Sequence, residues 1–323
     1  MVTRRQVLAL GALGMLAARV RAQPRRTKIG VLSSSPFETS VYANSVVQAF
    51  TELGYAEGGR ATFLYRFAEG GFDQYRKQAQ ELVAQECDLL LALRSEPPAR
   101  ALQFMRPAAP ILFLAVDYHP LESGMVTNLR NPDRNTTGVY VPQNALVARR
   151  VQILREVLPQ AKRLMVFADA YSADQVDAAR KAAAAANLQL LLVQFVTEPY
   201  DYNTYLREKG AIDADAFMNL ASPVFTRDRR QIREAVQRLG LPSMGTNALQ
   251  AEAGYLLCLG SNIAKVAKRV ADVGVRLLAG TKASAIPVEQ AEDSELLIND
   301  NTARQLEMKI ADSVRGRAVR IIR

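Results

Sequence analysis

The sequence predicts an α/β protein of two doubly wound parallel-sheet lobes joined by a hinge that the chain crosses several times. Short apolar runs alternate with segments of helical periodicity, which is the pattern of a parallel sheet covered on both faces. This alternation completes one array and then starts again. About 300 of the 323 residues remain once an N-terminal export signal is set aside, a length that suits two domains better than one core.

The export signal opens the chain. A twin-arginine pair, Arg4 and Arg5, precedes the apolar stretch 7–18, which contains none of the polar residues that an amphipathic helix would need. Ala22 completes a small-x-small cleavage site, so we predict that residues 1–22 are removed. An apolar stretch of about a dozen residues is too short to span a bilayer, which takes roughly 20. Positive charge beside the cleavage site favours the twin-arginine (Tat) route over the general secretory route.

The first array of elements begins and ends with a strand. Its strands are short apolar or alternating runs, and its helices carry apolar residues at helical spacing. In chain order, we predict strand Lys28–Ser33, helix Val41–Leu53, strand Ala61–Phe67, helix Phe72–Gln85, strand Asp88–Leu93, helix Pro97–Met105 and strand Ile111–Val116.

The second array repeats the same rhythm after a segment, Asn131–Asn144, whose prolines and asparagines indicate the first crossing between lobes. In chain order, we predict helix Ala145–Leu158, strand Arg163–Ala168, helix Asp174–Ala186, strand Gln189–Phe195, helix Tyr202–Gly210, strand Ala216–Leu220, helix Arg227–Leu239 and strand Pro242–Thr246.

The remaining residues are too few for a third lobe, so we expect the chain to revisit both lobes and thereby build the hinge. The predicted elements are strand Tyr255–Leu259, helix Asn262–Leu278, strand Leu296–Asn299 and a helix from Thr302 to about Val314. Lobe 1 would then comprise residues 27–142 with about 254–284, and lobe 2 residues 143–253 with about 285–323.

Charge and cysteine content argue against two classes of function. Removing the four arginines of the signal lowers the basic residues from 41 to 37 against 32 acidic ones, so the net charge falls from +9 to +5. The basic residues form no stripe interleaved with aromatics, and we expect no nucleic-acid partner. Two cysteines and one histidine cannot supply a four-ligand zinc site, and we expect no metal.

The two cysteines bear on the compartment. Cys87 and Cys258 lie in apolar surroundings typical of buried free thiols, although an oxidising compartment also allows a disulfide between them. Neither lies near the cleavage site, so no cysteine is placed for lipid attachment. We therefore expect a mature product that is soluble, not lipid-anchored, and periplasmic.

Enzymatic activity is not expected. The single histidine, His119, precedes a proline in a turn, and no Gly-x-Ser-x-Gly elbow accompanies any serine. No Walker sequence is present, and the first strand leads into Ser33–Pro36 instead of a glycine-rich dinucleotide turn. The pair Glu292 and Asp293 lies in a loop without a neighbour that would shift a carboxyl pKa. We predict no catalytic residue and no cofactor.

The candidate binding site follows from the fold class. Ligands of open parallel sheets sit beyond the carboxyl ends of the strands, where helix N-termini present unpaired N–H groups. Two lobes that face each other would enclose such a ligand in a cleft. The predicted strand-end residues are Ser33, Ser34, Ser35, Phe37, Arg94, Ser95, Glu96, Asp117 and Tyr118 in lobe 1, and Asp169, Tyr171, Ser172, Ser222, Phe225, Thr246 and Asn247 in lobe 2.

Several of these residues also have a purely structural interpretation. Ser34 and Ser35 could cap the helix that follows them. Arg94 suits a ligand carboxylate, because guanidinium binds carboxylates in a bidentate manner, but it could equally neutralise Glu96 or Asp117. The aromatic residues at the strand ends could contact an aromatic ligand or simply be exposed loop residues.

An ordered series of short motifs is shared with one protein family. The motifs are Leu53-Gly54-Tyr55, Asn135–Val139, Leu158-Pro159, Ile286–Glu289 and Leu296–Asn299. In order and spacing they resemble the ABC-transporter substrate-binding proteins that include tryptophan and tyrosine importers. The resemblance implies a type I periplasmic-binding-protein fold that closes on a small molecule and delivers it to an ABC permease in the inner membrane. It implies a ligand such as an amino acid, a carboxylate or an aromatic compound, and we expect a monomer.

The loops that would face the ligand depart from the family pattern. This chain has Arg94–Pro97 where relatives carry a small-Thr-Pro sequence, and Asp117–Pro120 where they show Thr-Asp-Pro. The ligand of the family therefore does not transfer. A periplasmic sensing module that docks on a membrane sensor kinase or receptor uses the same fold and stays an alternative. A repressor domain is disfavoured by the export signal.

Overall fold

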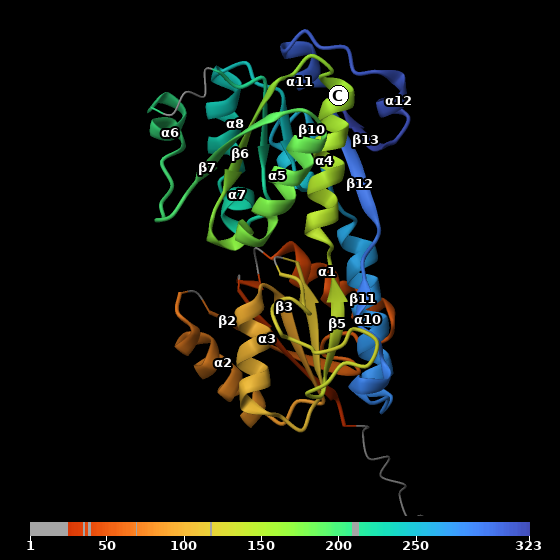
Figure 1. Cartoon of the computed structure of the whole chain (residues 1–323). Coiled ribbons are helices and arrows are strands. Elements are labelled where there is room, and N and C mark those ends of the chain that lie inside the picture. The colour runs from red at the N-terminus through yellow and green to blue at the C-terminus, as the bar shows by residue number, and fades with distance from the viewer. Residues whose placement is uncertain (1–24, 35, 38–39, 69, 117, 209–212) are drawn as a thin grey trace, which may run out of the picture.

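The computed structural model describes residues 25–34, 36–37, 40–68, 70–116, 118–208 and 213–323. The predicted export signal and two predicted site residues, Ser35 and Asp117, lie outside the described residues. The described chain forms two lobes, each on its own sheet, as Figure 1 shows. No helix that the structure describes combines the length and apolarity needed to cross a bilayer.

Lobe 1 is built on a sheet of order β11-β5-β4-β3-β1-β2 in which every strand pair is parallel. Alternate residues of its central strands point into separate apolar clusters, one shared with α1 and α10 and the other with α2 and α3. Its elements are β1 (Thr27–Ser33), α1 (Val41–Glu52), β2 (Ala61–Phe67), α2 (Phe72–Ala84), β3 (Leu89–Arg94), α3 (Glu96–Met105), β4 (Ile111–Ala115), β5 (Thr136–Tyr140), α10 (Ile263–Leu278) and β11 (Glu289–Gln290).

Lobe 2 is built on a sheet of order β13-β12-β10-β9-β8-β6-β7, in which β12 runs antiparallel to β10. Its helices include α4 (Gln143–Val157), η2 (Ala170–Gln175), α5 (Val176–Ala185), α6 (Tyr202–Glu208), α7 (Pro223–Arg227), α8 (Arg229–Arg238), α9 (Ala248–Glu252), α11 (Asp300–Gln305) and α12 (Asp312–Arg315). Its strands are β6 (Arg163–Ala168), β7 (Gln189–Gln194), β8 (Ala216–Asn219), β9 (Ser243–Gly245), β10 (Leu257–Ser261), β12 (Ser294–Asn299) and β13 (Ala318–Ile322).

The described chain passes between the lobes at three places. It leaves lobe 1 after β5 and enters α4, which packs on lobe 2. It returns between β10 and α10, and it crosses a last time between β11 and β12. Because the three crossings lie close together along one edge of the molecule (Figure 1), the two lobes can move as bodies about them.

The course of the chain differs from the sequence-based division of the lobes in two places. The sequence assigns residues from about 254 to 284 to lobe 1, whereas β10 pairs with β9 and β12 of lobe 2, and the return to lobe 1 begins with α10. The sequence assigns everything from about 285 to lobe 2, whereas β11 extends the sheet of lobe 1. An apolar strand carries no signal for the sheet that it joins, because that choice depends on distant partners.

The predicted crossing segment Asn131–Asn144 contains a strand that the sequence pattern did not reveal. Within it, β5 is fully buried, although it begins with two threonines and a glycine. Each threonine finds a partner: Thr136 Oγ1 accepts from Gln103 at 3.0 Å, and Thr137 Oγ1 donates to the Ile286 carbonyl at 2.7 Å. Polar residues can fill a central strand when distant groups satisfy them.

The helix predictions in lobe 2 need correction at three places. The predicted helix Asp174–Ala186 starts as a 3-10 turn, and Arg227–Leu239 is divided at Asp228 into α7 and α8. The predicted terminal helix from Thr302 to about Val314 is two short helices, followed by an unpredicted edge strand, β13. In β13 the adjacent residues Val319 and Arg320 are both exposed and the other three residues are half-buried, so the strand lacks the alternation that would predict it.

Candidate functional site

Two neighbouring cavities lie where the lobes face each other. The first, which we call the Arg94 cavity, has a volume of about 170 Å³ and is lined from both lobes. Its polar lining consists of Ser40, Tyr42 and Arg94 from lobe 1, Gln143 at the first crossing, and Ser222, Thr226, Thr246, Asn247 and Glu252 from lobe 2.

The second cavity, which we call the His119 cavity, has a volume of about 250 Å³. Gln143 lines both cavities, so the two meet at the start of α4. The lining of the His119 cavity comprises Tyr118, His119, Glu122 and Tyr140 from lobe 1, Gln290 of β11, and Asn144, Ala145 and Asp174 beyond the crossing.

Arg94 is the charged group of lobe 1 in the first cavity. It is the last residue of β3 and has a φ of 81°, a left-handed conformation that is rare for a bulky side chain. Its guanidinium carbon lies 6.0 Å from the centroid of the Tyr42 ring, which also lines the cavity. Backbone strain of this kind persists where the surroundings impose it, and it concentrates at functional sites.

The neighbours of Arg94 have separate roles. Glu96 pairs with Arg100 one turn further along α3, so its carboxylate is engaged within its own helix. Ser95 is buried, and its hydroxyl has no partner in the described part of the chain. One structural alternative for Arg94, neutralisation of Glu96, is thus not what this structure shows.

Ser33 and Ser34, at the end of β1, line neither cavity. Ser33 is buried at the end of the strand, and the Ser34 hydroxyl is buried with no partner among the described residues. The cap of α1 is Ser40, whose hydroxyl accepts from the Ala43 N–H at 3.2 Å. Phe37 packs on Tyr65 with ring centroids 4.1 Å apart.

In lobe 2, Asp169 organises two neighbouring strand ends. Its carboxylate accepts from the hydroxyl groups of Ser172 at 2.8 Å and Ser222 at 2.5 Å, and from the Tyr171 N–H at 3.1 Å. Burial raises the pKa of Asp169, and these hydrogen bonds oppose that shift. Since Asp169 and Ser172 are buried and mutually bonded, they hold the loop in place, and only Ser222 reaches the Arg94 cavity.

Of the remaining predicted residues of lobe 2, two line the Arg94 cavity and two do not. Asn247 caps α9 by accepting from the Gln250 N–H at 3.2 Å, and it lines the Arg94 cavity together with Thr246. Phe225 is fully buried in the aromatic core beside Phe167. Tyr171 is 43% exposed and lines neither cavity.

His119 fits the turn role that the sequence indicates. Its Nδ1 accepts from the Glu122 N–H at 3.4 Å, and its ring lies edge-on to Tyr140 with centroids 4.9 Å apart. Cys87 and Cys258 are both buried free thiols, and burial raises the pKa of Cys258 to about 12. Among the described residues, His, Cys, Asp and Glu form no group of three that could hold a metal ion.

Sequence reasoning missed three residues: Tyr42 lines the Arg94 cavity, Gln143 lines both cavities, and Arg150 donates to Gln143 from behind. Arg150 is fully buried in the middle of α4, where its Nε donates to the Leu259 carbonyl at 2.8 Å. Its Nη2 donates to Gln143 Oε1 at 3.3 Å. A usable signal was present, because Arg150 occupies the same helical stripe as Val147 and Leu154, where an apolar residue is expected.

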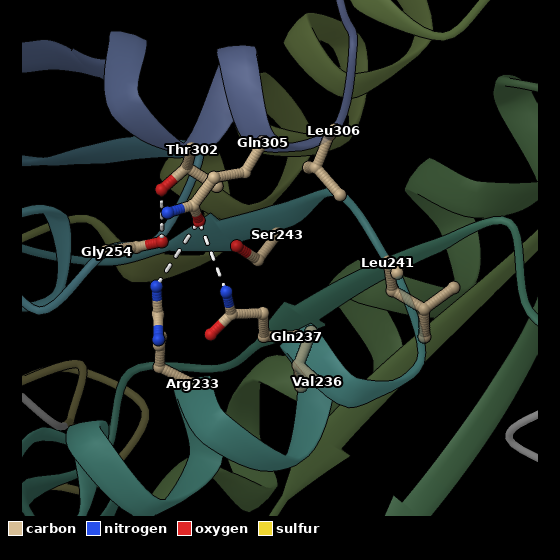
Figure 2. Close-up of a pocket in the computed structure, with 10 residues that line it drawn as sticks. Arg233, Val236, Gln237, Leu241, Ser243, Gly254, Thr302, Gln305 and Leu306 are labelled. Carbon is tan, nitrogen blue, oxygen red and sulfur yellow. Dashed lines mark hydrogen bonds between the residues drawn. The ribbon is translucent and has the colours of Figure 1, made fainter.

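A further pocket lies within lobe 2 alone. Figure 2 shows Arg233 and Gln237 of α8 both donating to Gln305 Oε1, at 3.5 and 3.2 Å. The Thr302 hydroxyl donates to the Gly254 carbonyl at 2.8 Å. These polar groups join α8, α11 and the turn before β10 to one another, so the pocket is a structural junction and contains no residue of lobe 1.

Comparison with known proteins agrees with this architecture. A family model described as ABC transporter substrate binding protein matches residues 26–322. The tyrosine-binding protein of Clostridioides difficile is 22% identical over 271 residues, covering 81% of this chain and 75% of that protein.

The fold is also found in crystal structures, of which two illustrate the likeness. A conserved domain protein from Vibrio cholerae superposes with a TM-score of 0.80 at 22% identity, covering 92% of this chain and all of the other. An ABC domain from Streptococcus pneumoniae in complex with L-Trp superposes with a TM-score of 0.78 at 20% identity, with the same coverage. At such identities the likeness establishes a fold of two α/β lobes and leaves the ligand open.

Proposed function

We propose a periplasmic carrier role for this chain, which belongs to the family of ABC transporter substrate binding proteins. The family membership makes it a solute-binding component of an ABC transporter. The finer steps are our proposal: the protein closes on a small molecule between its lobes, works outside the cytoplasm, and hands the molecule to an inner-membrane permease. No catalytic step is needed in this cycle.

The observation that carries the proposal is the Arg94 cavity, which residues from both lobes line at the carboxyl ends of parallel strands. A ligand shifts a protein toward a closed state only if it binds that state more tightly than the open one. A solute in this cavity would contact Arg94 in lobe 1 and the lobe 2 residues that line the cavity together. Its binding energy would therefore favour closure.

The size and lining of the cavities suit a small polar or aromatic solute. The relatives named above bind tyrosine or were crystallised with L-Trp, and we propose a solute of comparable size for this chain. The loops around Arg94 differ from the family pattern, so we do not assign the same amino acid.

The test is to purify the mature protein from a periplasmic extract, denature it, and identify the released small molecules by mass spectrometry. Compounds found there are then added back to refolded protein in a thermal-shift assay. We expect at least one released compound to raise the melting temperature in a saturable manner. An empty extract, together with no thermal shift from amino acids, carboxylates or sugars, would contradict the carrier role.

A further inference from the structure

Arg150 is a fully buried cation without a carboxylate partner among the described residues. Its two acceptors are neutral: the Leu259 carbonyl and the Gln143 side-chain oxygen. Its Nη1 has no hydrogen-bond partner in the part of the chain that the structure describes. Burial lowers its pKa to about 10, so it stays charged at neutral pH. A buried charge is costly unless an opposite charge or several dipoles compensate it.

Arg150 also fixes the orientation of Gln143. The two ends of a glutamine amide look alike in structure, and the assignment depends on the hydrogen-bond partners. Arginine has only donors, so the atom of Gln143 that faces Arg150 must be the oxygen. The amide nitrogen of Gln143, with its two N–H donors, is consequently the end left for other partners.

Gln143 is placed where such donors would meet a solute. It is the first residue of α4 after the chain crosses between lobes, and it lines both the Arg94 cavity and the His119 cavity. The polar groups of lobe 2 in the Arg94 cavity are already engaged: Ser222 donates to Asp169, and Asn247 donates to Thr226. The side-chain N–H donors of Gln143 therefore set the chemistry of this corner.

We propose that Gln143 and Arg150 select a carboxylate group on the solute, with Gln143 contacting it and Arg150 acting as the positioning residue behind. The inference rests on the proposed carrier function and names its substrate class. The bound carboxylate supplies the negative charge that Arg150 lacks within the described protein. Arg94 lines the same cavity from lobe 1.

A purely structural role for Arg150 would leave this selection untouched. In that case Arg150 only ties α4 to β10 through the Leu259 carbonyl. The decisive variant is Gln143→Glu, which keeps the shape of the side chain and places a carboxylate beside Arg150. If the cation lacks a partner, this change stabilises the empty protein and at the same time repels a carboxylate solute. A purely structural strut predicts instead that Arg150→Met leaves the ratio of carboxylate to amide affinity unchanged.

The probes are matched pairs that differ only at the carboxyl group: L-tyrosine and L-tyrosinamide, L-tryptophan and L-tryptophanamide, and phenylacetate and phenylacetamide. Any carboxylate found in the periplasmic extract is added with its own amide. Affinities are measured by isothermal titration calorimetry, and the melting temperature is recorded without solute. For wild type, we expect a carboxylate to bind about tenfold or more tightly than its amide.

The variants are Gln143→Glu, Gln143→Leu and Arg150→Met, with Arg149→Met as the matched control, since Arg149 is the adjacent, exposed arginine of α4. We expect Gln143→Glu to raise the melting temperature of the empty protein and to abolish the preference for carboxylates. Gln143→Leu and Arg150→Met should shrink that preference about tenfold, whereas Arg149→Met should keep it. If Arg150→Met fails to fold, the two Gln143 variants decide the result.

The outcomes separate this inference from the carrier role. A wild-type protein that binds amides as tightly as carboxylates, or a released solute without an acidic group, overturns the selection of carboxylates and leaves the carrier role intact. An unchanged carboxylate preference in Gln143→Glu also overturns it. An empty extract and no binding by any probe contradict the carrier role itself.

Discussion

Side chains around the cleft fall into two groups according to where their polar atoms are bonded. Asp169 and Ser222 bond to each other at 2.5 Å, so their polar atoms are largely committed within lobe 2. Gln143, in the second group, lines a cavity that both lobes share, and its amide nitrogen is left for a solute because its oxygen accepts from Arg150. The second group is where a solute gains most, because a ligand that replaces an internal hydrogen bond gains little net free energy.

The sequence located the strand ends but could not sort residues into these two groups. The hydrogen bond between Asp169 and Ser222 spans 53 positions of the chain, and the one between Arg150 and the Leu259 carbonyl spans 109. Local patterns carry no information on such partners. Phe225 follows a strand end as predicted, yet its side chain turns into the aromatic core instead of toward the cleft.

Arg94 gives a prediction in which binding and stability respond differently. Arg94→Ala should lower the affinity for an anionic solute by about tenfold or more, because a charge-assisted contact is lost. The melting temperature of the empty protein should stay nearly unchanged. Arg94→Gly should lose the same affinity and add about 1 kcal/mol to the free energy of unfolding, since glycine accepts a φ of 81° without strain. Calorimetry and chemical denaturation measure both effects.

Arg106 is the matched control for this prediction. It has a φ of 47° at the end of α3 and is exposed away from both cavities. Arg106→Gly should relieve backbone strain in the same way and leave solute affinity as in wild type. Unaltered affinity in Arg94→Ala would remove Arg94 as a contact of the solute.

Among the helices and strands, those with regular hydrophobic periodicity were predicted well, whereas irregular or polar elements were not predicted. The strands β1, β3 and β4 each have a buried, mostly apolar centre, and each was predicted. β5 was missed because its buried threonines depend on partners far along the chain. The packing of α10 on α1 was likewise invisible, although Gly274 marks it: a Cβ there would lie 2.3 Å from the ring of Phe50.

This close approach predicts the effect of enlarging Gly274. Gly274→Ala should destabilise the protein by about 1 kcal/mol or more, because overpacking against Phe50 outweighs the gain in helix propensity. In a Phe50→Leu background the smaller side chain leaves room, so the same substitution should cost much less. Urea denaturation of wild type, the two single variants and the double variant gives the coupling free energy between positions 50 and 274. Equal costs in both backgrounds would contradict the proposed clash.

Asp293 joins two of the crossings between lobes and predicts a pH dependence. It lies between β11 and β12, and it accepts from Arg269 at 3.0 Å and Lys265 at 3.3 Å, both on α10. Hydrogen bonding to Arg269 and Lys265 lowers its pKa. A carboxyl with a lowered folded-state pKa stabilises the protein above its unfolded pKa of about 3.9, and that stabilisation is lost as the pH falls through the folded value.

Asp293→Asn should therefore lower the free energy of unfolding by less than about 1 kcal/mol near neutral pH, because the pair is partly exposed. The difference between variant and wild type should vanish below about pH 3. Asp272→Asn, which removes the exposed pair with Lys268 on the same helix, is the control. A difference that persists undiminished in acid would show that Asp293 acts through packing and not through its charge.

For the molecule as a whole, the N-terminal sequence predicts a route out of the cytoplasm. Changing Arg4 and Arg5 to lysine should block twin-arginine export and leave the uncleaved precursor in the cytoplasmic fraction. Changing Arg25 and Arg26 to lysine, just beyond the predicted cleavage site, should leave export intact. Cell fractionation with immunoblotting measures both. Normal export of the Arg4 and Arg5 variant would assign the signal to the general secretory route.

Closure of the two lobes is the motion on which the proposed carrier role depends. Three crossings along one edge leave the lobes free to rotate as bodies, and a solute that contacts the lining of both lobes favours the closed arrangement. Carboxylates of both lobes, Glu122 and Asp174, line the His119 cavity and repel each other. Small-angle scattering should show a smaller radius of gyration with solute than without.

The repulsion between Glu122 and Asp174 opposes closure of the lobes. In the Asp174→Asn variant, the radius of gyration should therefore complete half of its decrease at a lower solute concentration than in wild type. Asp177→Asn is the matched control, since Asp177 lies one turn further along, is exposed, and lines neither cavity. Contraction that is insensitive to Asp174 would mean that the His119 cavity stays open when the Arg94 cavity closes. A radius that no bound solute changes would mean that the lobes hold a solute without closing, and release to a permease would then need a different trigger.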